Sequence, residues 1–140
     1  MQALIEYDRV AAPRERHDSL LDRTTGLPRW ELLIDRIEVA LNHARRTGSV
    51  VTLFLLYADG ADISDIATFA DHLRWWLHDG DTLARIGLSD FGILCTDIRT
   101  KTEASQHIER GAGVGFQLGC AVSRPDHTAD ELIRDAIADA

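Results

Sequence analysis

The sequence predicts an α/β (α+β) domain in which helices flank a mixed or antiparallel central sheet. Helical stripes of apolar residues alternate with short apolar runs rich in β-branched residues, which is the pattern of a mixed fold. The chain has 140 residues, a length that suits one domain. Apolar residues make up 45% and charged residues 27%, the composition of an ordinary globular protein.

The first half of the domain is predicted to be a helix, a buried strand and a second helix. Pro28 can begin a helix whose apolar stripe continues to Ala44 and which Gly48 ends. The segment 50–56 is a near-continuous apolar run, typical of a strand covered on both faces. Residues 66–77 again place apolar side chains at helical spacing.

The second half is predicted to begin with a hairpin, in which segments 82–86 and 91–95 flank a tight turn at 87–90. A short helix at 101–110 and a strand at 115–122 follow, and Thr128 or Asp130 can cap a last helix. From Val50 onward the order is β-α-β-β-α-β, the ferredoxin-like pattern. Residues 1–12 predict a short helix before Pro13, so we divide the chain into an N-terminal helical segment, 1–20, and a domain, 21–140.

Charge and composition argue against several kinds of partner. Residues 1–48 hold eight basic and eight acidic groups, whereas residues 49–140 hold 7 basic and 15 acidic groups, which is the whole net charge of −8. Such a surface repels nucleic acid and anionic membranes. No apolar run reaches the roughly 18 residues of a membrane span, and the start lacks a secretory signal. We therefore expect a cytoplasmic protein, with Cys95 and Cys120 reduced and no bound metal or cofactor.

Three stretches of the sequence resemble GGDEF domains, in the order in which those domains have them. Residues 22–29, Asp-Arg-Thr-Thr-Gly-Leu-Pro-Arg, resemble D-x-L-T-G-L-x-N-R. Residues 81–91 resemble D-T-V-A-R-L-G-G-D-E-F, and residues 129–134 resemble A-D-E-L-L-R. The resemblance covers about residues 20–140 and implies a shortened nucleotide-cyclase palm domain from bacterial cyclic di-GMP signalling.

The signature turn departs from the family pattern. Active members join two GTP molecules by two-metal phosphoryl transfer, with carboxylates holding the cations. Here the turn reads Gly87, Leu88, Ser89, Asp90 and Phe91. The first glycine and the phenylalanine remain, but Leu88 replaces a glycine and Ser89 replaces an acidic residue. Only Asp90 keeps a carboxylate, and we expect no catalytic residues.

Other family positions also differ. The resemblance places Tyr57 where the second metal carboxylate would stand, and a neutral phenol is a poor magnesium ligand. The insert that shapes the family's guanine pocket is missing between Asp59 and Asp81. The inhibitory product-binding motif, Arg-x-x-Asp, begins here with His78 and ends with Asp81, so it lacks the bidentate fork that grips phosphate.

These departures favour a catalytically inactive GGDEF-like module that acts through a protein partner or as a homodimer. A non-catalytic receptor for cyclic di-GMP or GTP is the alternative, although nucleotide binding is expected to be weak or absent. An active diguanylate cyclase is the third hypothesis, which the lost carboxylates disfavour.

Trp75 is the candidate interface residue, because helical spacing places it opposite the buried stripe of its helix. Two interpretations stay open for Trp75. A neighbouring element such as the N-terminal helix covers it, or it contacts another protein, since tryptophan is enriched at interfaces. His72 and His78 are predicted to be surface residues.

Overall fold

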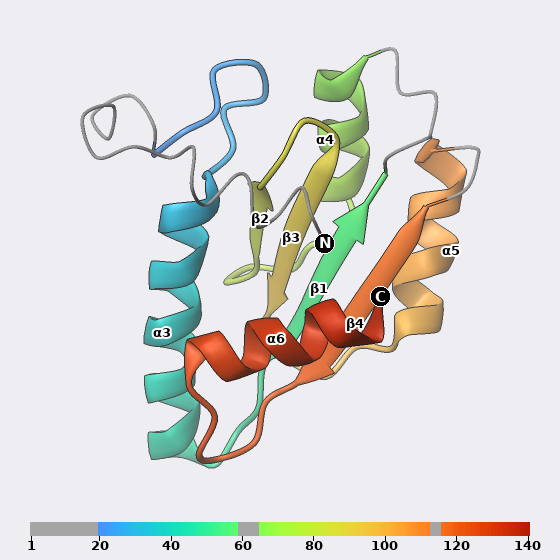
Figure 1. The fold of residues 1–140 in the computed structure, drawn as a ribbon. Helices are drawn as coiled ribbons and strands as arrows, with labels where there is room; N and C mark the ends of the chain where they lie inside the picture. Colours follow the sequence, from blue (N-terminus) through green and yellow to red (C-terminus); the bar gives the residue numbers. More distant parts are fainter. Residues whose placement is uncertain (1–19, 59–64, 113–115) are drawn as a thin grey trace.

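The computed structural model describes residues 20–58, 65–112 and 116–140 (Figure 1). The elements are α3 (Trp30–Thr47), β1 (Thr52–Tyr57), α4 (Ile66–Arg74), β2 (Thr82–Arg85), β3 (Asp90–Cys95), α5 (Lys101–Ala112), β4 (Gln117–Val122) and α6 (Ala129–Asp139). This order confirms the predicted β-α-β-β-α-β unit with a helix before and after it. The helix predicted at 1–12 lies outside the described residues.

The four strands form one sheet in the order β2-β3-β1-β4, and every neighbouring pair is antiparallel. Of the two predicted sheet types, the antiparallel one is therefore confirmed. In the register of β1 with β3, Thr52 is opposite Cys95 and Tyr57 is opposite Asp90. The β2–β3 turn consequently lies at the edge of the sheet where β1 ends.

Helices cover both faces of the sheet, with α3 and α6 on one face and α4 and α5 on the other (Figure 1). Strand β1 supplies both cores, because successive side chains point to opposite faces. Leu53 and Leu55 pack with α3 and α6, whereas Phe54 and Leu56 pack with α4 and α5. This arrangement explains the continuous apolar run that the sequence shows at 50–56.

The ends of three helices follow from local chemistry. Gly48 ends α3 in the left-handed conformation, at a φ of 72°. Thr128 begins α6 with a capping box, in which its hydroxyl accepts from the Glu131 amide. Helix α4 ends at Arg74 rather than at residue 77, because the chain tightens into i→i+3 bonds there; the Leu77 amide donates to the Arg74 carbonyl at 3.1 Å.

Helix α6 packs directly on β4 through Gly119. A Cβ at this position would stand 1.9 Å from the carbonyl oxygen of Ala136, so no larger residue fits while α6 keeps its place. Across the described ranges, no helix combines the length and the apolar character needed to cross a membrane.

Candidate functional site

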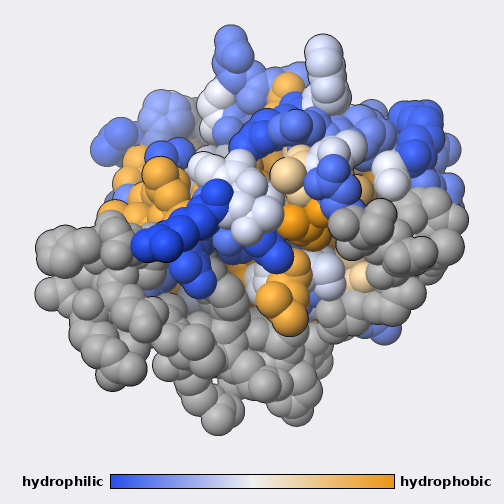
Figure 2. Space-filling model, turned by 90° about the horizontal axis from the view of Figure 1, so that it is seen from above, coloured by the Kyte–Doolittle hydropathy of each residue, from blue (hydrophilic) through white to orange (hydrophobic). Residues whose placement is uncertain are grey.

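The signature turn closes the hairpin between β2 and β3 and lies beside the end of β1 (Figure 1). The Ile86 amide donates to the Asp90 carbonyl at 2.8 Å, and the Ala58 amide donates to the Ser89 carbonyl at 3.2 Å. Leu88 stands at the tip of the turn and is 87% exposed. Seen from above, the molecule presents separate hydrophobic patches between hydrophilic side chains (Figure 2).

Asp90 is fully buried and lies against the backbone of the turn. A Cβ on Gly87 would stand 2.7 Å from the Asp90 Oδ2 atom. Any side chain at position 87 would therefore push the carboxylate out of its place. The first glycine of the signature thus has a packing role in this chain.

Tyr57 lies opposite Asp90 in the sheet and is 4% exposed. Its hydroxyl makes no hydrogen bond within the part of the chain that the structure describes. Burial, and then the nearby negative charge of Asp90, raise the pKa of Tyr57 to about 12. A neutral phenol beside one buried carboxylate does not fit a site for two magnesium ions. Of these two residues, only Asp90 offers a carboxylate.

Arg85 connects two of the stretches that resemble GGDEF domains, residues 22–29 and residues 81–91. Its Nη1 atom lies 3.2 Å from the Asp22 Oδ2 atom, and both side chains are largely buried. Its Nη2 atom donates to the Leu88 carbonyl at 2.6 Å, and its Nε atom donates to the Gly87 carbonyl at 3.2 Å. One guanidinium therefore holds the signature turn and the loop that carries Asp22.

The Asp22 carboxylate is stabilised in its charged form. Burial by itself would raise its pKa, but donors outweigh that effect and hold the pKa below its ordinary value. The Thr25 hydroxyl donates to Asp22 at 2.7 Å and the Thr25 amide at 2.8 Å, with Arg85 adding its charge. Asp22 of the first stretch and Arg85 of the second thus have a structural role in this chain.

At the opposite edge of the sheet, the Asp81 carboxylate is held inside the protein. Its side chain is 0% exposed, and it accepts from the His78 amide at 2.8 Å, the Thr96 amide at 3.1 Å and Arg99 at 2.5 Å. The His78 side chain is 67% exposed, with Nδ1 3.5 Å from Asp97. The side chains of His78 and Asp81 therefore do not form one phosphate-binding site.

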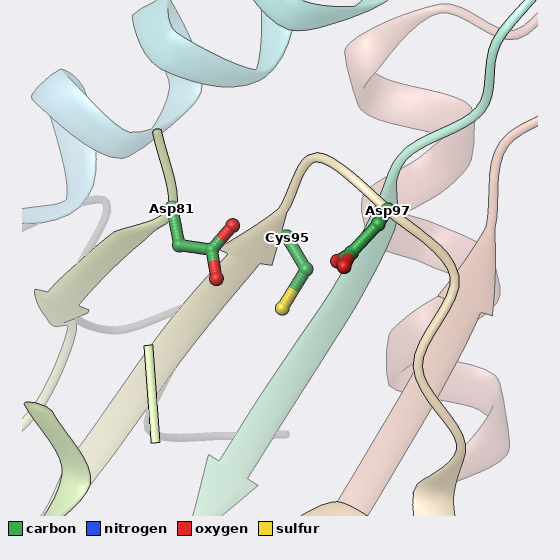
Figure 3. A group of neighbouring side chains, drawn as sticks. All are labelled: Asp81, Cys95 and Asp97. Carbon is green, nitrogen blue, oxygen red and sulfur yellow. The ribbon is translucent and has the colours of Figure 1, made fainter. Parts of the chain in front are cut away.

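Asp81, Cys95 and Asp97 place one ligand atom each within 4.8 Å of one another. Figure 3 shows the Cys95 side chain between the two carboxylates. The Arg99 guanidinium already contacts both carboxylates, donating from Nε to Asp97 at 3.1 Å. Burial raises the pKa of Cys95 to about 12, so its thiol stays protonated at neutral pH. This cluster is an ion-pair network centred on arginine, and its donor set does not favour a metal.

Trp75 follows the last residue of α4 and is 85% exposed. No residue in the described ranges covers it, and the proposed cover by segment 1–12 falls outside those ranges. The adjacent Trp76 turns inward instead, where its ring meets Phe54 edge-on and the Arg99 guanidinium lies 4.8 Å from its centroid.

The sequence analysis missed a pair of histidines between α4 and α5. His72 and His107 stack with ring centroids 4.2 Å apart and an interplanar angle of 7°. The Nε2 atom of each lies 2.6 Å from the backbone carbonyl oxygen of the other. His72 is half-buried at this contact, whereas His78 is exposed as predicted. The available signal was that His72 lies three residues after the buried Phe69, on the same side of α4.

No protein-family model and no curated protein sequence matches the chain. Solved structures do match. The GGDEF domain of FimX from Pseudomonas aeruginosa is 19% identical, with a TM-score of 0.69 over 86% of this chain and 91% of that one. The GGDEF domain of DgcB from Caulobacter crescentus, in complex with c-di-GMP, is 17% identical, with a TM-score of 0.69 over 86% and 85%.

The diguanylate cyclase SiaD from Pseudomonas aeruginosa, in complex with its activator SiaC, also matches. It is 18% identical, with a TM-score of 0.69 over 99% of this chain and 68% of that one. These similarities confirm the predicted fold: the chain has the fold of a GGDEF domain, in which a four-stranded antiparallel sheet carries helices on both faces.

Proposed function

We propose that this chain is a non-enzymatic module that keeps a GGDEF-like fold as a scaffold and acts through a protein partner or by homodimerisation. The observation that carries the proposal is the pairing of Tyr57 with Asp90 at the end of β1. Two-metal transfer needs hard, charged oxygen ligands for both cations. A phenol with a pKa of about 12 remains neutral at physiological pH, which leaves Asp90 as the carboxylate of that strand pair.

A role in protein association is supported by the exposed Trp75. Large aromatic side chains at this exposure are costly in water and are enriched at interface hot spots. The structure of SiaD with its activator SiaC offers a parallel, because there a protein with this fold binds another protein. We extend that parallel to this chain as part of the proposal.

The alternative of a nucleotide receptor has weaker support. The GGDEF domain of DgcB was solved with c-di-GMP. In this chain the Asp81 carboxylate is enclosed and bound to Arg99, and the arginine of the family's motif is replaced by His78. We expect calorimetric titration with cyclic di-GMP to give no isotherm. A micromolar isotherm that disappears in His78→Ala would favour the receptor instead.

The test of the missing enzyme activity is incubation with GTP and magnesium or manganese. We expect no cyclic di-GMP, measured by chromatography beside a known active cyclase as positive control. Product above the level of a heat-treated sample of this chain would overturn the proposal. Nucleotide hydrolysis without cyclic product would also contradict it.

A further inference from the structure

A groove of about 510 Å³ lies between α3 and the edge of the sheet where β2 begins and β3 ends. Figure 1 shows α3 standing beside β2, the edge strand. Val39, Ala40 and Leu94 supply its apolar lining, and Val39 is 60% exposed. The groove is on the face of the sheet that α3 and α6 cover, away from the signature turn.

Basic side chains border this apolar lining. Arg36, His43 and Arg46 all line the groove from α3. They follow the helical spacing i, i+7 and i+10, with Val39 between them at i+3, so they share one side of the helix. Among the groove-lining residues that the structure describes, none is acidic.

Arg36 and Arg46, like Arg45 and Arg110, have no acidic partner among the described residues. Elsewhere, Arg74, Arg85, Arg99 and Arg134 each lie beside an aspartate. By contrast, Arg36 and Arg46 form no ion pair with any residue in the described ranges, although the chain carries a net charge of −8. An acidic protein that leaves cations unpaired around an apolar groove offers a surface complementary to a negatively charged ligand.

We propose that this groove binds an acidic amphipathic segment of a partner protein. Its apolar side chains would pack on Val39 and Ala40, and its carboxylates would lie beside Arg36 and Arg46. Charge complementarity and the apolar lining together favour this occupant over nucleic acid, which the acidic remainder of the chain repels. The inference rests on the proposed function as an interaction module and assigns its partner a chemistry.

The test is a selection of random 16-residue peptides displayed on phage against the full chain. We expect the enriched peptides to carry Asp or Glu flanking Leu, Ile or Phe. In fluorescence anisotropy, Arg46→Glu should weaken their binding at least tenfold, and rising salt should weaken binding to the wild type. Val39→Glu should also weaken binding, because it removes apolar lining and adds a repelling charge.

Arg110→Glu is the matched control. Arg46 and Arg110 are both exposed arginines in the last turn of a helix, on α3 and α5 respectively. The control variant should bind the selected peptides within about twofold of the wild type, well inside the tenfold step that corresponds to 1.4 kcal/mol. Circular dichroism checks that each variant is folded.

Several outcomes overturn the inference. They are no enrichment of acidic peptides, equal weakening by Arg46→Glu and Arg110→Glu, or binding of cyclic di-GMP that Arg46→Glu abolishes. A wild-type dimer that Arg46→Glu dissociates would assign the groove to a second copy instead. Peptides that bind without regard to Arg46 would defeat the groove assignment but leave the proposed function standing, whereas cyclic di-GMP synthesis from GTP would defeat the proposed function itself.

Discussion

Tyr57 illustrates how one side chain changes the chemistry at the end of β1. Its buried hydroxyl finds no hydrogen-bond partner among the described residues, and such a hydroxyl costs about 1–3 kcal/mol. We therefore expect Tyr57→Phe to raise the free energy of unfolding by about 1 kcal/mol at pH 7, measured by urea denaturation. A loss of stability would show that the hydroxyl is hydrogen-bonded.

The raised pKa of Tyr57 also predicts that the stability of the wild type falls at alkaline pH. The pKa of Tyr57 is about 12 in the folded protein against an ordinary value of 10.0, so the unfolded chain loses this proton first. Fewer bound protons in the unfolded state mean that stability falls as pH rises from 10 towards 12. The stability difference between Tyr57→Phe and the wild type should therefore widen over this range, and a constant difference would contradict the raised pKa.

Arg85 is the second residue whose loss should be costly. Arg85→Ala leaves the largely buried Asp22 charge without its cation and frees two turn carbonyls, so we expect a loss of about 2 kcal/mol. The pKa of Asp22 is lowered from its ordinary value of 3.8, so the charged carboxylate stabilises the folded protein above pH 3.8. This stabilisation is lost as the pH falls below that value. The control is Arg134→Ala, whose pair with Asp130 is exposed and should change stability by less than about 0.5 kcal/mol.

At the scale of elements, the histidine pair makes the contact between α4 and α5 sensitive to acid. Burial lowers the pKa of His107, and the nearby His72 and Arg110 add to the effect. As pH falls below the ordinary value of 6.5, the unfolded chain therefore takes up this proton before the folded one, and stability decreases. The stacked geometry strengthens the argument, since two imidazolium rings 4.2 Å apart repel each other.

The measurement is the melting temperature of wild type and His107→Gln between pH 5 and 7.5. Glutamine keeps an N–H donor but does not titrate, so we expect a flatter dependence on pH. His43→Gln is the control, because His43 is exposed and stacks on no ring in the part of the chain described. Parallel curves for all three proteins would show that the pair does not control acid stability.

The elements also show what sequence patterns can predict. The apolar run of β1, the glycine that ends α3 and the cap of α6 depend on neighbouring residues, and all three were confirmed. The end of α4 was placed three residues too late, at 77 instead of Arg74. There the Trp76 carbonyl accepts from Arg99 at 3.0 Å, a contact 23 residues along the chain that no local pattern predicts.

The candidate site was also predicted only in part from the sequence. The sequence predicted the hairpin turn and placed Tyr57 near Asp90 through the resemblance. It did not predict that Arg85 reaches Asp22, 63 residues away, or that His72 meets His107 at a separation of 35. Periodicity identifies the buried side of an element, whereas the partner on that side depends on how the elements pack.

At the scale of the molecule, the residues beside the signature turn are enclosed, whereas Trp75 and the groove are open to partners. The signature turn lies at the edge where β1 ends, and there Tyr57 and Asp90 are enclosed. Trp75 is exposed at the end of α4, on the face of the sheet that α4 and α5 cover, whereas the groove opens between α3 and the start of β2 on the other face. If the proposed function is correct, variants at Trp75 or in the groove should alter association, and variants at the turn should not.

Trp75→Ala tests this expectation directly. Because Trp75 is 85% exposed, its replacement should leave the free energy of unfolding within about 0.5 kcal/mol of the wild type. An interface hot spot contributes about 2 kcal/mol or more, which corresponds to roughly 30-fold in a dissociation constant. In light scattering, a wild-type dimer should therefore become monomeric in Trp75→Ala while remaining folded. Leu88→Ala, which replaces an equally exposed apolar residue in the signature turn, should stay dimeric. A wild type that is monomeric at every concentration would rule out self-association through Trp75, and the partner should then be sought by comparing what wild type and Trp75→Ala retain in a pull-down.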